Sequence, residues 1–307
     1  MSEFYANNAT EAQFRLGVDL GGTKTEVVVL DHKSEPVYRK RVATPVHDYE
    51  AILTLIGELV NEAGKSLPVK PTIGIGTPGA ISPITGLLRN SSTACLNGKA
   101  FLTDIEKRLK SRVKVQNDAN CFALSEALTG AGKGYDVVFG VIIGTGTGGG
   151  LVVNRKLLTG PNAISGEWAH NPLPWISDID GSEDCYCGKR DCIETFVSGS
   201  GMANNFNKRY STTSRSEDIV QGARNGEKNC ELAMSLYYDQ LARALAHVIN
   251  IVDPDVIVLG GGMSNIEEIY QEVPPRLGDY IFSDCFQTPV LPAKHGDASG
   301  VFGAAML

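Results

Sequence analysis

Three cysteines lie within eight residues of one another in a polar stretch of the chain, at Cys185, Cys187 and Cys192. A C-x-C pair with glycine directly after it and a third cysteine close behind is a spacing at which thiolates can hold zinc. A closed tetrahedral site needs a fourth ligand, and His170 is the only one of the five histidines near the cluster in sequence. Unliganded thiols this close together would be prone to oxidation. The spacing therefore predicts a Cys₃His zinc site.

Three glycine-rich turns could bind phosphate: Gly21-Gly22-Thr23, Gly144-Thr145-Gly146 and Gly260-Gly261-Gly262. Closely spaced glycines have unusual backbone freedom and let backbone N–H groups approach phosphate oxygens, while Thr23 and Thr145 add hydroxyl donors. Any one of these turns alone is more simply an ordinary hairpin turn. Three in one chain, two of them in similar hairpins, favour binding of a nucleotide's phosphates.

Two segments also match the dinucleotide pattern G-x-G-x-x-G, at residues 74–79 and 144–149. That pattern must open a helix, because the pyrophosphate sits on the helix N-terminus. Here a proline-containing loop follows the first match and a second strand follows the other. We therefore predict that neither segment binds a dinucleotide.

The stretch "QNDAN" places Asn117 and Asp118 where a strand ends and a helix begins. An α/β fold presents polar side chains to ligands at such strand ends. Asparagine and aspartate are also common caps of helix N-termini. The residues alone leave both interpretations open.

The elements that must position these residues form two similar halves. A strand, a glycine turn and a second strand are expected over residues 14–31, and the same pattern returns over 137–154. Residues 48–64 and 236–252 carry apolar side chains at helical spacing, which indicates helices that pack on the sheets. The repeat predicts two similar α/β domains facing a cleft. Further strands are expected over 36–44, 72–82, 113–117 and 254–262, and helices over 101–110 and from 118 to 128.

Composition excludes several classes of protein. The 307 residues are 42% hydrophobic and 21% charged, and no apolar run approaches the roughly 20 residues of a membrane span. No cleavable signal is recognisable, so we expect a cytoplasmic protein in which the seven cysteines stay reduced. The net charge of −7 disfavours nucleic acid and anionic membrane as partners. Residues 1–13 lack periodicity and predict a loose leader.

Six segments together resemble the ROK family (repressor, open reading frame, kinase), and in particular its bacterial fructokinase or mannofructokinase branch. They are "GVDLGGTKTEVVVLD", "NDAN", "IIGTGTGGG", "GEWAHNPLPW", "CYCGKRDCIETF" and "HVINIVDPDVIVLGGG", and the resemblance runs from about Leu16 to the end of the chain. It implies an α/β fold of the actin-like ATPase (ribonuclease H-like) type, with duplicated domains flanking a cleft. The expected domains are residues 1–116, completed by a C-terminal helix at about 296–307, and residues 117–295.

The resemblance also implies roles for individual residues in phosphoryl transfer from ATP with Mg²⁺ to a hexose. The first phosphate loop would comprise Asp19, Gly21, Gly22, Thr23 and Lys24. The second would comprise Gly144, Thr145 and Gly146, and Gly260, Gly261 and Gly262 would lie against the adenosine. Asp118 would be the catalytic base, and the sugar contacts would be Asn117, Glu167, His170 and Glu194. The structural Zn²⁺ would bind His170, Cys185, Cys187 and Cys192.

A single zinc ion would then fix both ends of the loop that carries the carboxylates of Glu167 and Glu194. One departure is Ala169, where the family usually has glycine before the histidine. The resemblance implies a homodimer as well.

The expected function is that of a fructokinase, which makes fructose 6-phosphate from fructose and ATP. Alternatives within the family are a kinase for glucose, mannose or N-acetylglucosamine, a transcriptional regulator, and a sugar sensor without catalysis. The sequence before Leu16 is too short for a helix-turn-helix domain and holds one basic residue. The presence of Asp118 and of both phosphate loops argues against a sensor.

Overall fold

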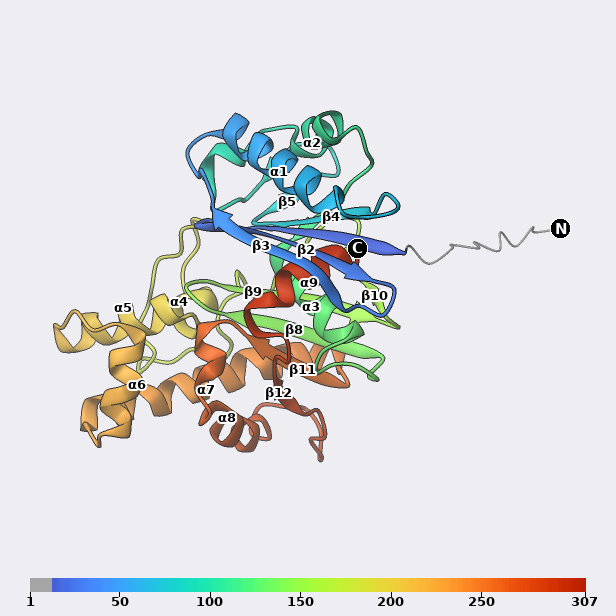
Figure 1. Ribbon diagram of the computed structural model, residues 1–307. Helices are drawn as coiled ribbons and strands as arrows, with labels where there is room; N and C mark the ends of the chain where they lie inside the picture. The colour runs from blue at the N-terminus through green and yellow to red at the C-terminus, as the bar shows by residue number, and fades with distance from the viewer. Residues whose placement is uncertain (1–12) are drawn as a thin grey trace. The chain divides into compact units, whose positions relative to one another are not determined.

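The structure is a computed structural model that describes residues 13–307 (Figure 1). The chain forms two compact units. Unit 1 comprises the residues up to Cys121 together with Gly300–Leu307, and unit 2 comprises Phe122–Ser299. Except for Gln13, the leader expected over residues 1–13 lies outside the described residues. Within the described part of the chain, no helix is long and apolar enough to cross a membrane.

The two units contain five-stranded sheets of the same topology. In each sheet the first three strands in sequence pair antiparallel, and the remaining two continue the sheet in parallel from the first. Unit 1 has the order β3-β2-β1-β4-β7, with β1 (Phe14–Leu20), β2 (Lys24–Asp31), β3 (Pro36–Ala43), β4 (Thr72–Thr77) and β7 (Lys114–Asn117). Unit 2 has the order β10-β9-β8-β11-β12, with β8 (Val137–Ile143), β9 (Thr147–Val153), β10 (Lys156–Leu157), β11 (Val256–Gly260) and β12 (Val290–Pro292). The predicted duplicated α/β fold is confirmed.

Helices cover both faces of the sheet in unit 1 (Figure 1). Asp48 caps the predicted helix α1 (Tyr49–Gly64) by accepting a hydrogen bond from the Ala51 amide, at 3.0 Å. The apolar face of α1 packs with the alternate strand residues Leu16 and Val18 in one buried cluster. Unit 1 also contains β5 (Ala80–Ile81), β6 (Leu88–Arg89), η1 (Ala94–Leu96) and α2 (Phe101–Leu109), and the C-terminal helix is α9 (Ser299–Ala305).

Glycines on the other face of this sheet allow α9 to lie directly on it. Gly17 of β1 and Gly74 of β4 are neighbours in the sheet register. A Cβ at Gly17 would overlap the Val301 carbonyl oxygen, and one at Gly74 would overlap that of Ala304. The close approach of helix backbone to strand backbone therefore requires glycine at both positions.

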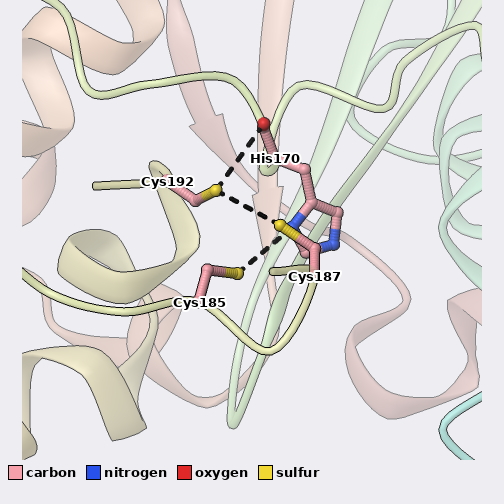
Figure 2. Close-up of side chains that lie close together, drawn as sticks. All are labelled: His170, Cys185, Cys187 and Cys192. Atoms are coloured by element: carbon pink, nitrogen blue, oxygen red, sulfur yellow. Dashed lines mark hydrogen bonds between the residues drawn. The ribbon is translucent and has the colours of Figure 1, made fainter. Parts of the chain in front are cut away.

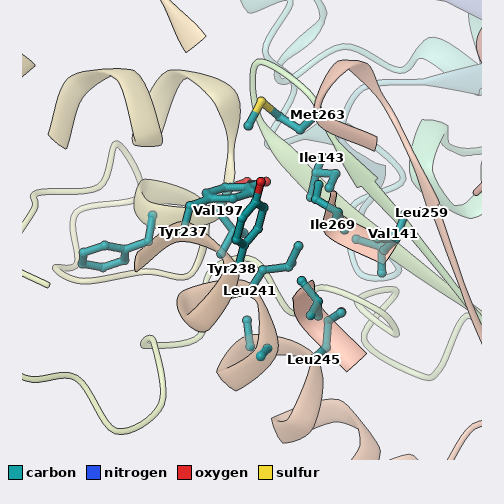
Figure 3. Packing of buried hydrophobic residues seen from close by; sticks show 14 of the residues in the cluster. Val141, Ile143, Val197, Tyr237, Tyr238, Leu241, Leu245, Leu259, Met263 and Ile269 are labelled. Carbon is teal, nitrogen blue, oxygen red and sulfur yellow. Dashed lines mark hydrogen bonds between the residues drawn. The ribbon is translucent and has the colours of Figure 1, made fainter. Parts of the chain in front are cut away.

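The core of unit 2 is built around the long helix α7 (Figure 3). Leu241 and Leu245 of α7 belong to one buried cluster with Val141 of β8 and Leu259 of β11. The helices of this unit are most of α3 (Asp118–Leu128), which begins in unit 1, and α4 (Glu194–Val197), α5 (Gly199–Tyr210), α6 (Ser216–Arg224), α7 (Lys228–Val252), α8 (Ile269–Leu277), η2 (Gly262–Asn265) and η3 (Gly296–Ala298). Helix α7 begins eight residues before the predicted start at 236.

Unit 2 repeats the use of strand glycines to accommodate a helix. A Cβ at Gly140 of β8 would lie 2.7 Å from the Ala123 Cα of α3, and one at Gly260 of β11 would overlap the Phe122 ring. Packing against α3 therefore accounts for glycine at position 260. The equivalent arrangement in the two units extends the duplication from strand order to helix packing.

Candidate functional site

The first glycine turn joins β1 to β2 in unit 1 and is held from two sides. The Gly21 amide donates to the Lys24 carbonyl oxygen at 3.0 Å, which closes the turn. Thr44, just after β3, donates its amide to the Thr23 carbonyl at 3.0 Å and its hydroxyl to the Gly21 carbonyl at 2.9 Å. Sequence reasoning missed Thr44, because a threonine beyond a strand end carries no pattern of its own.

The glycines of this turn provide space and do not adopt unusual backbone angles. Neither Gly21 nor Gly22 has a φ in the left-handed region, so this turn does not use the backbone freedom that glycine offers. A Cβ at Gly21 would lie 2.8 Å from the Lys24 carbonyl oxygen. A Cβ at the exposed Gly22 would meet only the Thr93 hydroxyl, 4.0 Å away, among the described residues. Glycine at position 22 thus leaves the backbone accessible to a ligand.

Two carboxyl groups interact electrostatically at the strand ends of unit 1. Burial, followed by the negative charges of Asp118 and Glu26, raises the pKa of Asp19 to about 7 against the opposing effect of Arg41. Gly300 leaves room for this carboxylate, since a Cβ there would lie 2.7 Å from the Asp19 Oδ2. A divalent cation would relieve the repulsion between Asp19 and Asp118, and carboxylate oxygens are the ligands that Mg²⁺ prefers.

Asn117 caps helix α3 and thereby orients the residue that follows it. Its Oδ1 accepts hydrogen bonds from the amides of Ala119 at 2.9 Å and Asn120 at 3.4 Å. Its Nδ2 donates to the Gly79 carbonyl at 3.3 Å. Asp118 Oδ1 also accepts from the Ala119 amide, at 2.8 Å. The capping interpretation therefore applies to Asn117, and the rigid cap fixes the position of the Asp118 carboxylate.

The second glycine turn lies between β8 and β9 in unit 2. Its closing hydrogen bond runs from the Gly144 amide to the Gly146 carbonyl at 2.9 Å, and Gly199 at the start of α5 donates to the Gly144 carbonyl at 2.7 Å. A Cβ at Gly144 would meet only Gly262 N at 3.9 Å and Gly146 O at 4.0 Å, so nothing among the described residues requires glycine there. The backbone of this turn is therefore accessible to a ligand, as is the backbone at Gly22.

The third glycine run lies against this second turn. Gly261 has a φ of 85°, and a Cβ on it would lie 2.6 Å from the Ile143 carbonyl oxygen, so only glycine fits. A Cβ at Gly262 would have no described atom within 4 Å. Two glycine runs that are more than a hundred residues apart in sequence therefore lie together in unit 2, and the backbone of both is accessible.

His170 and the three predicted cysteines converge in unit 2 (Figure 2). Their ligand atoms all lie within 4.8 Å of one another. The distance from Cys185 Sγ to His170 Nδ1 is 3.6 Å, and that from Cys187 Sγ to Cys192 Sγ is also 3.6 Å. Tetrahedral zinc with Zn–S bonds of about 2.3 Å sets its sulfurs roughly 3.8 Å apart. The cluster therefore has the ligand set and spacing of a structural zinc site.

Local backbone pairing brings the four ligands together. The Cys185 amide donates to the Lys189 carbonyl at 2.8 Å, which forms a tight knuckle with Gly188 at a φ of 84°. Pro172 pairs with Cys192 in an antiparallel bridge, so the chain that follows His170 runs beside the third cysteine. The ligand geometry thus follows from hydrogen bonds that this chain makes by itself.

Glu194 connects the zinc cluster to the second glycine turn. Its amide donates to the Ala169 carbonyl at 3.0 Å, and its Oε2 accepts from the Thr147 amide at 2.9 Å. A Cβ at Gly146 would lie 2.9 Å from the same oxygen. The methyl group of Ala169 is buried, so the departure from the family's glycine is accommodated. Glu167, at the other end of this stretch, is exposed.

A buried ion pair that sequence reasoning missed anchors the loop before the zinc knuckle. Arg243 of α7 and Asp180 are nearly inaccessible to solvent and lie 2.6 Å apart. Gln240 donates to Asp180 at 3.0 Å, and Arg243 also donates to the Trp175 carbonyl at 3.0 Å. An arginine within the apolar stretch "LARALAHV" could have indicated this buried ion pair. Such a charge, when buried, must be paired.

The predicted site residues therefore form one group in each unit. Asp19, the first glycine turn with Lys24, Asn117 and Asp118 belong to unit 1. The second and third glycine runs, Glu167, Glu194 and the four predicted zinc ligands belong to unit 2. As predicted, neither G-x-G-x-x-G match opens a helix, since β5 follows the first and the second runs into β9.

The sequence pattern of the ROK family matches residues 15–307. The chain belongs to the ROK family. It is 39% identical over 296 residues to an N-acetyl-D-glucosamine kinase of Pectobacterium carotovorum, with 95% of this chain and 97% of the relative aligned. An N-acetyl-D-glucosamine kinase of Yersinia pseudotuberculosis is 37% identical over the same length.

Solved structures of the family share the fold. A ROK hexokinase from Thermus thermophilus superimposes with a TM-score of 0.86 at 26% identity, over 95% of this chain and 97% of that one. A ROK family glucokinase from Streptomyces griseus, solved with glucose and AMPPNP, gives a TM-score of 0.77 at 26% identity, over 95% and 98% of the two chains. These similarities agree with the duplicated sheets described above.

Proposed function

We propose that this protein is an ATP-dependent N-acetyl-D-glucosamine kinase of the ROK family. The observation that carries the proposal is the alignment, over 95% of the chain, with relatives that bear this name. The sequence motifs alone suggested fructose as the substrate. These relatives instead favour N-acetylglucosamine, which was one of the alternatives. The chain also holds the groups that phosphoryl transfer requires, namely accessible glycine backbone, acidic residues and a carboxylate at a helix start.

Asp118 would accept the proton of the attacking sugar hydroxyl. Phosphoryl transfer demands little covalent chemistry from the protein, so positioning and charge neutralisation dominate. The cap formed by Asn117 supplies the positioning, because it fixes the first turn of α3. Asp19 would hold Mg²⁺, which when bound neutralises charge on the transferring phosphate.

The open glycine turns would bind the phosphates of ATP through backbone N–H groups. Gly22 and Gly144 support this role, since a side chain at either position would project into space that no described residue fills. Thr23 and Thr145 would add hydroxyl donors, and Lys24 a positive charge. Gly261 and Gly262 would lie against the adenosine.

Residues around the zinc cluster would bind the sugar. Glu167, His170 and Glu194 would contact its hydroxyls, with Asn117 as a further contact. Four protein ligands leave zinc no open position, so the metal would act by fixing geometry and not as a Lewis acid on phosphate.

The experiment compares Asp118→Asn with the wild-type protein. We expect N-acetylglucosamine-dependent ADP release to fall by at least about a hundredfold, because an amide cannot accept the proton. Binding of N-acetylglucosamine, measured by calorimetry without ATP, should change little, since shape and polarity are kept. Turnover close to wild type would exclude Asp118 as the base. Substitution of the exposed Asp178 by Asn should leave both measurements unchanged.

A further inference from the structure

Tyr186 occupies the position between the first two cysteines of the zinc knuckle and faces solvent with its ring. The side chain is 81% exposed, which is unusual for an aromatic residue held by specific contacts. Its hydroxyl lies 3.0 Å from His170 Nε2, and its ring meets the imidazole edge to face with centroids 5.2 Å apart. The contacts fix where the hydroxyl lies and leave the ring open to a ligand.

The two ring nitrogens of His170 have different partners. These partners determine whether the Tyr186 hydroxyl can donate a hydrogen bond to another group. Nδ1 faces Cys185 within the cluster, and Figure 2 shows the other ring nitrogen pointing away from the sulfurs. Metal at Nδ1 would leave the proton on Nε2, which then donates to the Tyr186 oxygen. The O–H hydrogen of Tyr186 would remain available to donate to a third group.

The surroundings of this hydroxyl are rich in acceptors. Tyr186 and Glu194 line a pocket of about 170 Å³ together with Ser198 and Asn204. A tyrosine hydroxyl can both donate and accept hydrogen bonds. Because carboxylates only accept hydrogen bonds, a hydroxylated ligand held here also needs a donor for its own oxygens.

We propose that Tyr186 is a sugar-contacting residue, whose hydroxyl is held by His170 and donates to an oxygen of the bound sugar. The hydrogen bond of 3.0 Å between His170 Nε2 and the Tyr186 oxygen would hold the hydroxyl in place for that contact. The exposed ring would at the same time cover apolar C–H groups of the sugar. This inference rests on the proposed function and adds a specificity residue to that sugar site.

The test uses Tyr186→Phe, Tyr186→Ala and, as a matched control, Phe in place of the exposed Tyr135. Calorimetry without ATP measures the affinity for N-acetylglucosamine and for glucose. Loss of one hydrogen bond in Tyr186→Phe should weaken sugar binding by about fivefold to tenfold. Tyr186→Ala should weaken it further, because the ring is lost too. The KM for ATP, the zinc content and the affinity of the Tyr135 variant should stay at wild-type values.

Two results would overturn the inference. The first is wild-type sugar affinity in Tyr186→Phe. The second is loss of zinc from that variant, which would make Tyr186 an orienting partner of the ligand His170, since such partners change metal affinity about 10-fold to 100-fold. A wild-type protein that binds hexose without phosphorylating it would count against the proposed function alone, and the Tyr186 comparison would still be decided by calorimetry.

Discussion

The buried carboxyl of Asp19 makes the stability of the protein depend on pH. Its pKa is about 7 in the folded chain, against 3.8 when exposed. Between these values the folded state holds a proton that the unfolded state has released, so stability falls as pH rises from about 4 to above 7. Asparagine removes the titration and keeps the shape.

We therefore expect Asp19→Asn to raise the melting temperature over wild type at pH 8, with a much smaller difference at pH 5. Thermal unfolding without Mg²⁺ or nucleotide, at several pH values, provides the measurement. The exposed Asp178→Asn should show no such dependence on pH. A difference between Asp19→Asn and wild type that is the same at both pH values would show that the carboxyl is not held protonated.

The sequence predicted the contacts of some functional residues and not those of others. The cysteine spacing was sufficient to predict the cluster with His170, because thiolate knuckles depend on local backbone geometry. The partners Thr44 and Asp180 depend on contacts between segments far apart in sequence, so no local pattern indicated them. Gly260 was expected to lie against the adenosine, and its packing on Phe122 is a further reason for glycine there that no pattern indicated.

The packing of α9 on strand glycines should contribute to the stability of unit 1. Gly17→Ala would drive a methyl group into the helix backbone at Val301, and overpacking of this kind costs about 1–3 kcal/mol or more. We expect the free energy of unfolding, measured with urea, to fall by at least that amount. Gly64→Ala is the control, because a Cβ there meets nothing within 4 Å among the described residues and alanine favours the helix. Equal stability of the two variants would contradict the packing described here.

The zinc loop is the second element whose integrity can be tested separately. The purified protein should hold about one zinc ion per chain, and Cys187→Ser should lose it. Without the cross-link the stretch from Glu167 to Glu194 should be less ordered, and binding of the sugar would have to order it, so affinity for N-acetylglucosamine should fall more than affinity for ATP. Elemental analysis and titrations check this, with the exposed Cys285→Ser as a control that keeps its zinc. A fully active wild type without metal, or a variant that loses ATP binding alone, would contradict the zinc assignment.

Some elements were not predictable from local sequence. Helix α5 opens with Gly199-Ser200-Gly201, and α8 contains Pro274 and Pro275, so both contradict helix propensity. Tertiary packing decides their structure, since Met202 and Phe206 of α5 are buried in the core of unit 2. The longer strands and α1 were predicted because their apolar periodicity is strong and short-range, whereas the short strands β6, β10 and β12 were not.

For the whole chain, the domain duplication could be predicted from the sequence. The identity of the sugar substrate could not. Each half contains a hairpin with a glycine turn, and hairpins can be recognised from local sequence patterns. We expect sugar choice to depend on hydrogen bonds from loops such as residues 90–98. In that loop Asn97 binds the amide of Ser91 at 2.9 Å and shapes the backbone in a way that no pattern indicates. The motifs that suggested fructose surround the zinc cluster, which is a structural feature and does not specify one hexose.

The specificity constant for each common hexose tests the central claim most directly. The wild-type protein should be assayed by coupled ADP release at saturating ATP and Mg²⁺ with N-acetylglucosamine, glucose, mannose and fructose. We predict that N-acetylglucosamine has the highest kcat/KM, by about tenfold or more over fructose, since one well-placed polar contact discriminates by at least that factor. A higher kcat/KM for fructose, or no turnover of any hexose, would contradict the account.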